Sequence, residues 1–340
     1  MKKSISLNKI IFFFLAFIIW ALAALNTYTV DRSNYEMFYA YAGKGIHYPG
    51  IEVGFYYLMR FASIVGMSFQ NFLIMYSSVA IIIFFKAIRK YISKGINIIL
   101  ALFIYFPYLH LVATLRNFMA SVILIFAIQF LIEDNKKSKY KYCICVIIAA
   151  CFHIFSISAL LFLLCKLPYK RIKNIAMVFS VIGFFVLIFG SEINSVLIKL
   201  IPKLSVYILD GMNGTRGVTK VFLFIYFISK CVFCVSLPVS DKEDRLILIF
   251  RNINLILLVF LPLCMYNMNF MRMEYDLFIL MAIFVYKNVA ENNDAENKKI
   301  ITVLFFAYYL LSGYILLYLF SYESIVKNVW ENNFIFKSFL

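Results

Sequence analysis

The chain has 340 residues, of which 64% are hydrophobic, 19% aromatic and only 15% charged, and its formal net charge is +16. Soluble domains have roughly 45–50% apolar and about 25% charged residues, so this composition excludes an ordinary soluble domain. The alternating polar and apolar pattern of an outer-membrane barrel is also absent. We therefore predict an all-α fold, a polytopic transmembrane helical bundle of about 9–11 membrane segments, some of them short or re-entrant.

Apolar runs of the length that a bilayer crossing needs, roughly 20 residues, follow one another along the chain. The first, near residues 10–27, follows a basic start and has no small-residue cleavage site, so we expect a crossing that is retained. Further crossings are expected near 70–87, 96–111, 114–132, 175–190, 219–238, 246–266, 273–289 and 300–320. Together they predict a single integral membrane domain over residues 1–340.

Residues 142–165 allow two interpretations, a hairpin of two half-length helices or one crossing kinked near His153. With the hairpin, and with residues 53–66 kept on the outer side, the cytoplasmic segments hold 20 Lys and Arg and the outer segments hold 11. A single crossing would move one basic cluster outside. The positive-inside rule therefore favours the hairpin.

Most of the irregular polar sequence falls in two long outer segments, about 26–69 and 190–218. The first contains a Tyr-rich and Gly-rich loop over 26–52, and the second has turn-forming residues around 211–217. Long structured loops often carry function. The cytoplasmic loops are short and basic, so we interpret the positive charge as a determinant of orientation, and we expect no nucleic-acid partner.

Sequence signatures of metals and nucleotides are missing from the chain. Cys231 and Cys234 are spaced like a metal pair but have no second pair and no His at zinc spacing. No Walker A loop, GxGxxG or HExxH occurs. We expect free cysteines, no metal and no cofactor.

Arg116 and His153 are out of place in apolar segments on the predicted outer side. Arg116 opens the span 114–132, where it either snorkels to lipid headgroups or binds an anion with the help of the helix N-terminus. His153 lies about 12 residues beyond a cytoplasmic loop, roughly 18 Å along a helix. It is either a hydrogen-bonded core residue or a proton carrier.

Arg272 stands at another predicted outer helix start, with Tyr275 one turn further along the same face. Glu274 and Asp276 flank it, so a local ion-pair cluster is the structural alternative. Lys230 and Arg251 lie inside spans and need partners that the sequence does not identify.

Glu52 precedes a short apolar helix, where it either caps the helix or serves as a carboxylate base. Several other outer charges, taken singly, are ordinary loop charges. They are Asp31, Arg32, Arg60, Arg216 and Lys220.

Four stretches carry a family resemblance: "DRSNYEMFYAY…GIEVGFYYLMRF", "ATLRNFMASVILIFAIQFLIEDNKKSKY", "AACFHIFSISALLFLL" and "FMRMEYDLFI". They resemble the EpsG-like group of Wzy-type polysaccharide polymerases, with an Arg-(Asn/Gln)-x-x-Ala helix and a Phe-His segment. One departure is the spacing after His153, where two residues precede Ser156.

The resemblance implies a GT-C-like helical enzyme of the bacterial inner membrane, with its active site facing the periplasm or exterior. Such enzymes join glycan repeats carried on undecaprenyl pyrophosphate, so lipid-linked donor and acceptor glycans are the implied partners, with a chain-length regulator as a further candidate. An O-antigen ligase and a flippase or transporter for lipid-linked glycans are the alternatives.

The predicted site follows from this chemistry. His153 is the catalytic residue, with Glu52 as second candidate. Arg116, Arg272 and Arg216 are the predicted pyrophosphate ligands. Supporting roles fall to Asp31, Arg60, Tyr275 and Lys220.

Overall fold

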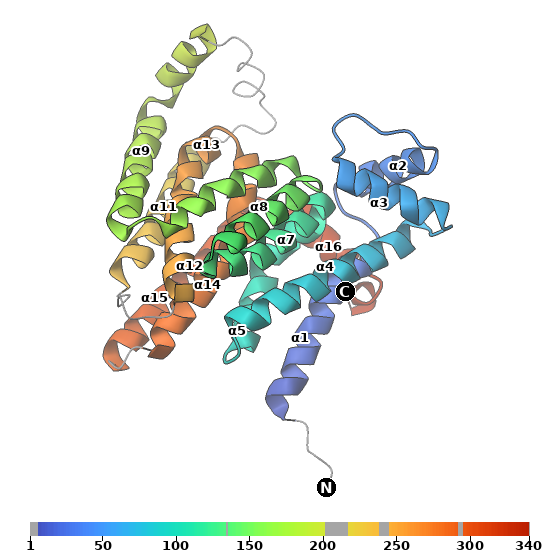
Figure 1. Ribbon diagram of the computed structural model, residues 1–340, viewed down its shortest axis with the longest axis horizontal. Coiled ribbons are helices and arrows are strands. Elements are labelled where there is room, and N and C mark those ends of the chain that lie inside the picture. Colours follow the sequence, from blue (N-terminus) through green and yellow to red (C-terminus); the bar gives the residue numbers. More distant parts are fainter. Residues whose placement is uncertain (1–5, 134, 201–216, 238–244, 292–294, 340) are drawn as a thin grey trace. The chain divides into compact units, whose positions relative to one another are not determined.

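The computed structural model describes residues 6–133, 135–200, 217–237, 245–291 and 295–339. Nearly all of these residues are helical, and within these ranges the only β-type pairing is an isolated bridge between Asn26 and Asn333. Eight helical segments of the described chain are long and apolar enough to cross a membrane (Figure 1). The predicted all-α fold of a polytopic membrane protein is confirmed.

The chain forms two compact units. Unit 1 comprises Met1–Leu160, Asp276–Ile283 and Phe305–Leu340, and unit 2 comprises Leu161–Tyr275 and Phe284–Leu304. The first part of unit 1 contains α1 (Leu7–Ala24), α2 (Arg32–Gly43), α3 (Val53–Ile64), α4 (Phe69–Tyr91), α5 (Ile96–Phe103), the π-helix η1 (Ile104–Tyr108), α6 (Leu109–Ala113), α7 (Leu115–Ile132) and α8 (Lys136–Ala150).

Three helices contain residues of both units: the 3-10 helix η2 (Ile154–Lys166), α14 (Arg272–Glu291) and α15 (Ala295–Gly313). Unit 1 ends with η6 (Tyr314–Leu319), η7 (Tyr322–Val326), α16 (Lys327–Glu331) and η8 (Phe336–Phe339). Unit 2 contains α9 (Tyr169–Leu200), α11 (Gly217–Ser236), α12 (Arg245–Ile256), η4 (Leu257–Phe260), α13 (Leu261–Tyr266) and η5 (Met268–Met271).

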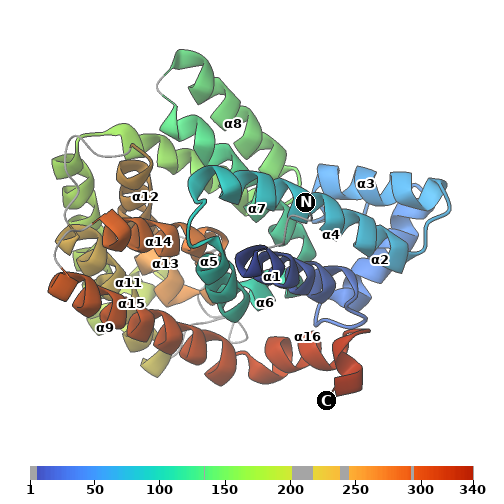
Figure 2. The ribbon, with the colours of Figure 1, turned by 90° about the horizontal axis from the view of Figure 1, so that it is seen from below.

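The core of unit 1 is built on α4 and α7, which lie side by side in both views (Figures 1 and 2). Tyr76 donates a hydrogen bond to the Leu115 carbonyl at 3.1 Å, and Tyr91 donates to the Ile125 carbonyl at 2.6 Å. Residue numbers rise together in these two contacts, so the helices run in the same direction. The two tyrosines are separated by roughly 22 Å along α4.

The first outer segment is more regular than predicted. Residues 32–43, expected within a loop, form α2, whose Tyr35, Tyr39 and Ala42 share one face and are buried. This spacing of four and three residues is helical, but aromatic and polar residues around it hide the pattern. α3 has 12 residues, roughly 18 Å, and is too short to cross a bilayer.

Residues 136–166 form the predicted hairpin. α8 ends at Ala150, a turn follows, and η2 begins at Ile154. Tyr142 of α8 donates a hydrogen bond to the Ala159 carbonyl of η2 at 2.7 Å. In one continuous helix these residues would be roughly 25 Å apart, so the chain reverses between them.

Unit 2 shows two differences from the prediction. α9 continues to Leu200 with a kink at Phe189, so residues 191–200 are helical where the sequence predicted a loop. The remainder of that predicted loop, 201–216, lies outside the described residues. The predicted span 273–289 is a helix, α14, but it starts with Arg272, Glu274 and Asp276 and is not among the eight apolar segments. Its crossing stays a prediction.

Candidate active site

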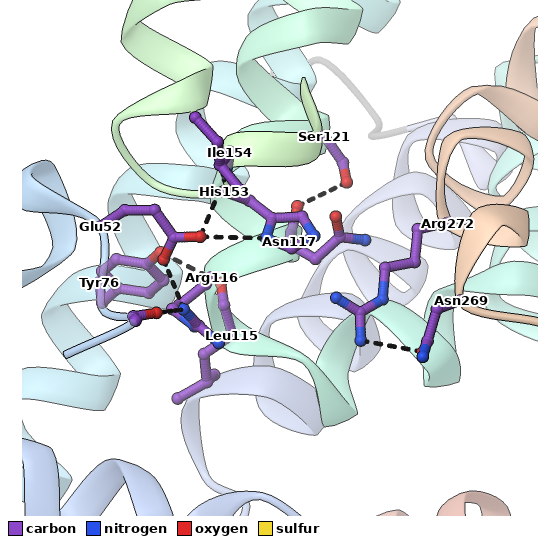
Figure 3. A network of polar contacts seen from close by, with 11 residues as sticks. Glu52, Tyr76, Leu115, Arg116, Asn117, Ser121, His153, Ile154, Asn269 and Arg272 are labelled. Carbon is purple, nitrogen blue, oxygen red and sulfur yellow. Dashed lines mark hydrogen bonds and ion pairs between the residues drawn. The ribbon is translucent and has the colours of Figure 1, made fainter. Parts of the chain in front are cut away.

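Glu52 is the centre of a polar site in unit 1 (Figure 3). It holds the N-cap position of α3, but its side chain makes no cap hydrogen bond. Glu52 therefore stands at the predicted cap position but does not cap α3 by a side-chain hydrogen bond. One carboxylate oxygen, Oε2, accepts from Nη1 of Arg116 at 2.5 Å. The other, Oε1, lies 3.1 Å from the Ile154 N–H and 3.4 Å from Nδ1 of His153.

Arg116 is the second residue of α7, as the sequence predicted, and its side chain is 24% exposed. Its Nη1 group also donates to the Gly50 carbonyl at 2.9 Å. Gly50 has a φ of +84°, a conformation that favours glycine and that directs this carbonyl. The Nε hydrogen of Arg116 is buried and has no hydrogen-bond partner among the described residues. One edge of the guanidinium is therefore incompletely satisfied.

His153 lies in the turn between α8 and η2, and its side chain is 9% exposed. A neutral imidazole that donates its Nδ1 hydrogen to Glu52 carries the lone pair on Nε2. The 3.4 Å separation is long for a hydrogen bond, a geometry that is common at catalytic groups without substrate. The arrangement suits a histidine that is oriented by a carboxylate and accepts a proton at Nε2.

Backbone contacts fasten the Glu52 segment to the hairpin turn. The N–H groups of Gly54 and Phe55, in the first turn of α3, have no acceptor within the helix and donate to the Cys151 carbonyl at 2.8 and 3.3 Å. In return, the Ile154 N–H at the start of η2 donates to Glu52. A Cβ added at Gly54 would lie 2.8 Å from the Cys151 oxygen, so only glycine permits this approach. The two helix starts cap each other and thereby fix Glu52 against His153.

The environment keeps Glu52 ionised. Burial raises the pKa of the carboxyl, but the hydrogen bond with His153, the charge of Arg116 and the Ile154 N–H together lower it from 4.5 to about 2. In α2, burial raises the pKa of Tyr35 to about 12, with a further increase from Asp31 and an opposing effect of Arg116. Tyr35 therefore stays protonated beside Arg116, and Asp31 is close enough to act on it.

Two tyrosines of the site had no signal in the sequence. Tyr35 and Tyr76 are 3% and 0% exposed, and Tyr76 bonds to the carbonyl of Leu115, the residue before Arg116. The rings of Phe55 and Phe152 lie 5.6 and 6.4 Å from that of Tyr76. Tyr76 is thus packed among aromatic rings next to the start of α7. With 24 tyrosines in the chain, composition gave no reason to select these two.

The other predicted residues of unit 1 are only partly connected to these contacts. Asp31 precedes α2 and acts on Tyr35, as described. Arg60, two turns into α3, donates to Tyr56 at 3.3 Å and lies against Gly45. Within the residues that the structure describes, Arg60 forms no hydrogen bond or ion pair with Glu52, so its supporting role stays a prediction.

The remaining candidates belong to unit 2 or fall outside the described residues. Arg272 begins α14 and donates to Asn269 at 3.3 Å (Figure 3). Tyr275 is buried one turn later. Lys220 lies in α11 near Gly190. Arg216 is outside the described residues. The predicted roles of these four residues stay predictions.

Unit 2 supplies a partner for Lys230 that the sequence did not identify. Its Nζ lies 2.6 and 2.7 Å from the two carboxylate oxygens of Glu274, and Tyr226 donates to the same carboxylate at 2.8 Å. The side chains of Lys230 and Glu274 are 0% and 1% exposed. Arg251 stacks on Tyr169, with its guanidinium carbon 3.9 Å from the ring centroid. Glu274, predicted as a neighbour of Arg272, thus binds Lys230.

All seven cysteines are free thiols, and the described residues include no group of three or more His, Cys, Asp or Glu side chains suited to a metal. Fold and site together define a multi-pass helical membrane protein that holds a carboxylate, a guanidinium and an imidazole at the start of one buried helix.

Comparison with family models matches residues 9–334 to the EpsG family, and the chain belongs to it. This is a family of Wzy-like polymerases, so the general function is that of a membrane polysaccharide polymerase. Neither the curated proteins nor the solved structures include a significant match to the chain.

Proposed function

We propose that the protein joins oligosaccharide repeat units carried on undecaprenyl pyrophosphate into a longer glycan, with undecaprenyl pyrophosphate as the leaving group. The observation that carries this proposal is the convergence of Glu52, Arg116 and His153, residues from three distant stretches of the chain. Glycosyl transfer from a pyrophosphate needs two functions: a base for the attacking hydroxyl and a cation for the departing phosphate.

His153 is the proposed base. A hydroxyl of the acceptor glycan attacks the anomeric carbon of the donor, and the bond from that carbon to the pyrophosphate oxygen breaks. The hydroxyl proton moves to Nε2 of His153, while Glu52 holds Nδ1–H and stabilises the imidazolium that forms. Because the pKa of Glu52 is about 2, the carboxylate is too weak a base for this step and acts as the orienting group.

Arg116 is the proposed pyrophosphate ligand. Its buried, unpartnered Nε–H and the adjacent Nη2 form the edge that binds phosphate oxygens bidentately. In the resting site Arg116 and ionised Glu52 balance each other, since they form an ion pair. Proton transfer to His153 adds one positive charge as the pyrophosphate gains its negative charge. Arg272, Arg216 and Lys220 are retained as candidates for further cations.

The direct test uses the purified full chain in a detergent micelle with a synthetic lipid-pyrophosphate repeat unit. We expect elongation without any nucleotide sugar, and release of one lipid pyrophosphate for each glycosidic bond formed. Failure with the cognate repeat, together with translocation of that lipid by reconstituted protein, would instead support the flippase alternative. Transfer to a lipid A core without repeat elongation would support the ligase.

Arg116→Lys separates the proposed phosphate ligand from a snorkelling cation. A lysine keeps the charge but loses the bidentate edge, so we expect turnover to fall on the order of 10²-fold with the protein still folded. Wild-type chain length in this variant would remove bidentate binding from the mechanism. Arg32→Lys is the matched control, because Arg32 lies in the same outer segment and its guanidinium donates to Glu36, the Asn26 carbonyl and Gln70 but to no residue of the candidate site.

A further inference from the structure

A second feature of unit 1 is a groove of about 960 Å³ between the start of α1, the end of α4 and the start of α5. Lys9, Arg89 and Lys94 line it and are all exposed. In the part of the chain that the structure describes, none of the three forms an ion pair with a carboxylate. The groove therefore gathers three uncompensated positive charges.

Backbone donors add to this charge. α5 begins at Ile96, after Gly95, and the carbonyl of Gly95 accepts from the N–H groups of Ile98 and Ile99. No hydrogen bond within the described residues uses the N–H groups of Ile96 and Asn97, which lie at the positive end of the helix. Asn97 also donates to the Asn8 carbonyl at 3.0 Å, which fixes α1 beside α5.

The same groove has an apolar side. Phe12, Phe13 and Ile92 line it, and the Arg89 guanidinium carbon lies 4.8 Å from the centroid of the Phe12 ring. Phe13 is 64% exposed and begins an apolar strip on α1 that continues through Phe14 and Phe17. A ligand for this groove needs a phosphate-like anion at one end and a hydrocarbon chain at the other.

We propose that this groove binds the headgroup of an anionic phospholipid, with the phosphate on Arg89, Lys94 and the start of α5 and an acyl chain along α1. Lys9 adds long-range attraction from the opposite wall. Charge complementarity commits the site to an anionic lipid, because a zwitterionic headgroup carries no net charge to match three cations.

The groove is separate from the candidate active site. Arg89 lies near the end of α4, whereas Tyr76, which bonds to the start of α7 beside Arg116, lies 13 residues earlier, roughly 20 Å along the helix. The two sites are therefore at opposite ends of the α4–α7 pair. On the orientation predicted from the basic residues, the groove faces the cytoplasmic leaflet, where anionic lipids attract basic segments.

Native mass spectrometry of the full chain, released from dodecyl maltoside micelles with equimolar phosphatidylglycerol and phosphatidylcholine, tests the proposal. We expect preferential retention of phosphatidylglycerol by the wild type. Arg89→Gln should weaken its apparent binding about five-fold, the value of one basic residue near an anionic surface. The triple variant Lys9→Gln/Arg89→Gln/Lys94→Gln should abolish the preference.

The matched control removes three other exposed lysines of unit 1, as Lys136→Gln/Lys137→Gln/Lys139→Gln in α8, and should keep the preference. If both triple variants lose the preference for phosphatidylglycerol equally, the binding is non-specific charge attraction and the proposal is wrong. Unchanged lipid binding in the groove variant would also overturn the proposal. Competition by soluble glycerol phosphate as strong as that by the lipid would identify a small-anion site and overturn the assignment to a lipid.

Discussion

The Arg116–Glu52 pair of unit 1 is partly buried and the Lys230–Glu274 pair of unit 2 is fully buried, and their charges are satisfied to different degrees. Lys230 and Glu274 are 0% and 1% exposed, and the carboxylate also accepts from Tyr226. Arg116 and Glu52 are 24% and 11% exposed, and Arg116 keeps a buried Nε–H that has no partner in the described part of the chain.

This difference separates a structural ion pair from one that is suited to a ligand. A fully enclosed pair has no surface that a substrate could contact. Its role is structural, because removing either partner leaves the other charge buried and unpaired, which strongly destabilises the fold. A pair with an unsatisfied donor can form one more hydrogen bond when a ligand with an acceptor atom binds. On burial alone the Lys230 pair would be the more conspicuous candidate for function, but the geometry favours the Arg116 pair.

The largest effect that we expect is on turnover when His153 is replaced. His153→Ala removes the proposed proton acceptor, so the elongation rate should fall by about 10²–10⁴-fold, the usual contribution of a general base. The protein should stay folded, with a thermal midpoint lowered by the loss of the contact between His153 and Glu52. Exogenous imidazole should restore part of the rate, which a purely structural histidine would not show.

The second effect concerns stability and should be confined to the enclosed pair. Lys230→Met leaves the Glu274 charge buried without its cation, so the free energy of unfolding should fall by about 3–5 kcal/mol. Lys230→Met/Glu274→Met should recover most of that loss, because it replaces both charges with apolar groups. Unfolding of each variant in mixed micelles by a denaturing detergent measures both quantities.

The same double replacement distinguishes the two pairs. The Arg116→Met/Glu52→Met protein should fold but have no elongation activity. The Lys230→Met/Glu274→Met protein should elongate glycan at the wild-type rate per folded molecule. Elongation activity in Arg116→Met/Glu52→Met would show that both pairs are structural, and the proposed difference in function between them would be wrong.

A smaller effect should follow from loosening the segment that carries Glu52. The Cβ of Gly54→Ala would lie 2.8 Å from the Cys151 oxygen and 2.9 Å from the Cys151 Cβ, so the α3 start must move away from the hairpin turn. Overpacking of this kind costs about 1–3 kcal/mol, which should appear as a lower thermal midpoint together with slower elongation. Gly217→Ala, where an added Cβ meets nothing within 4 Å, is the control and should change neither.

The sequence predicted the large features because they depend on composition and periodicity. Apolar length located the spans, and the distribution of basic residues selected the hairpin over one kinked crossing. The helix α2 was not predicted, because its buried face is made of tyrosines among polar residues and gives no apolar pattern. Regular helix also replaced part of a predicted loop at 191–200, since turn-forming residues lie only beyond it.

The pairing of charges was less predictable. Arg116 and His153 were selected as charges out of place, and that signal located two members of the site. Their link through Glu52 spans 64 and 101 residues, and Glu274 finds Lys230 44 residues away rather than binding its neighbour on the helix. Partners at such separations are decided by how helices pack, which a local pattern does not encode.

The smallest effect that we expect is the pH dependence of stability that Glu52 contributes. Its folded pKa, about 2, lies below the value of 4.5 for a free carboxyl, so the folded state favours the ionised form. The resulting stabilisation is complete above pH 4.5 and is lost as the pH falls from there toward 2. Glu52→Gln cannot titrate, so its thermal midpoint should lie below that of the wild type near neutral pH, and the gap should close as the pH falls below 4.5. A difference in thermal midpoint that stays constant down to about pH 3 would show that Glu52 is not held ionised by Arg116 and His153. The Arg116–Glu52 pair would then lack the charged carboxylate on which its contrast with the Lys230–Glu274 pair depends.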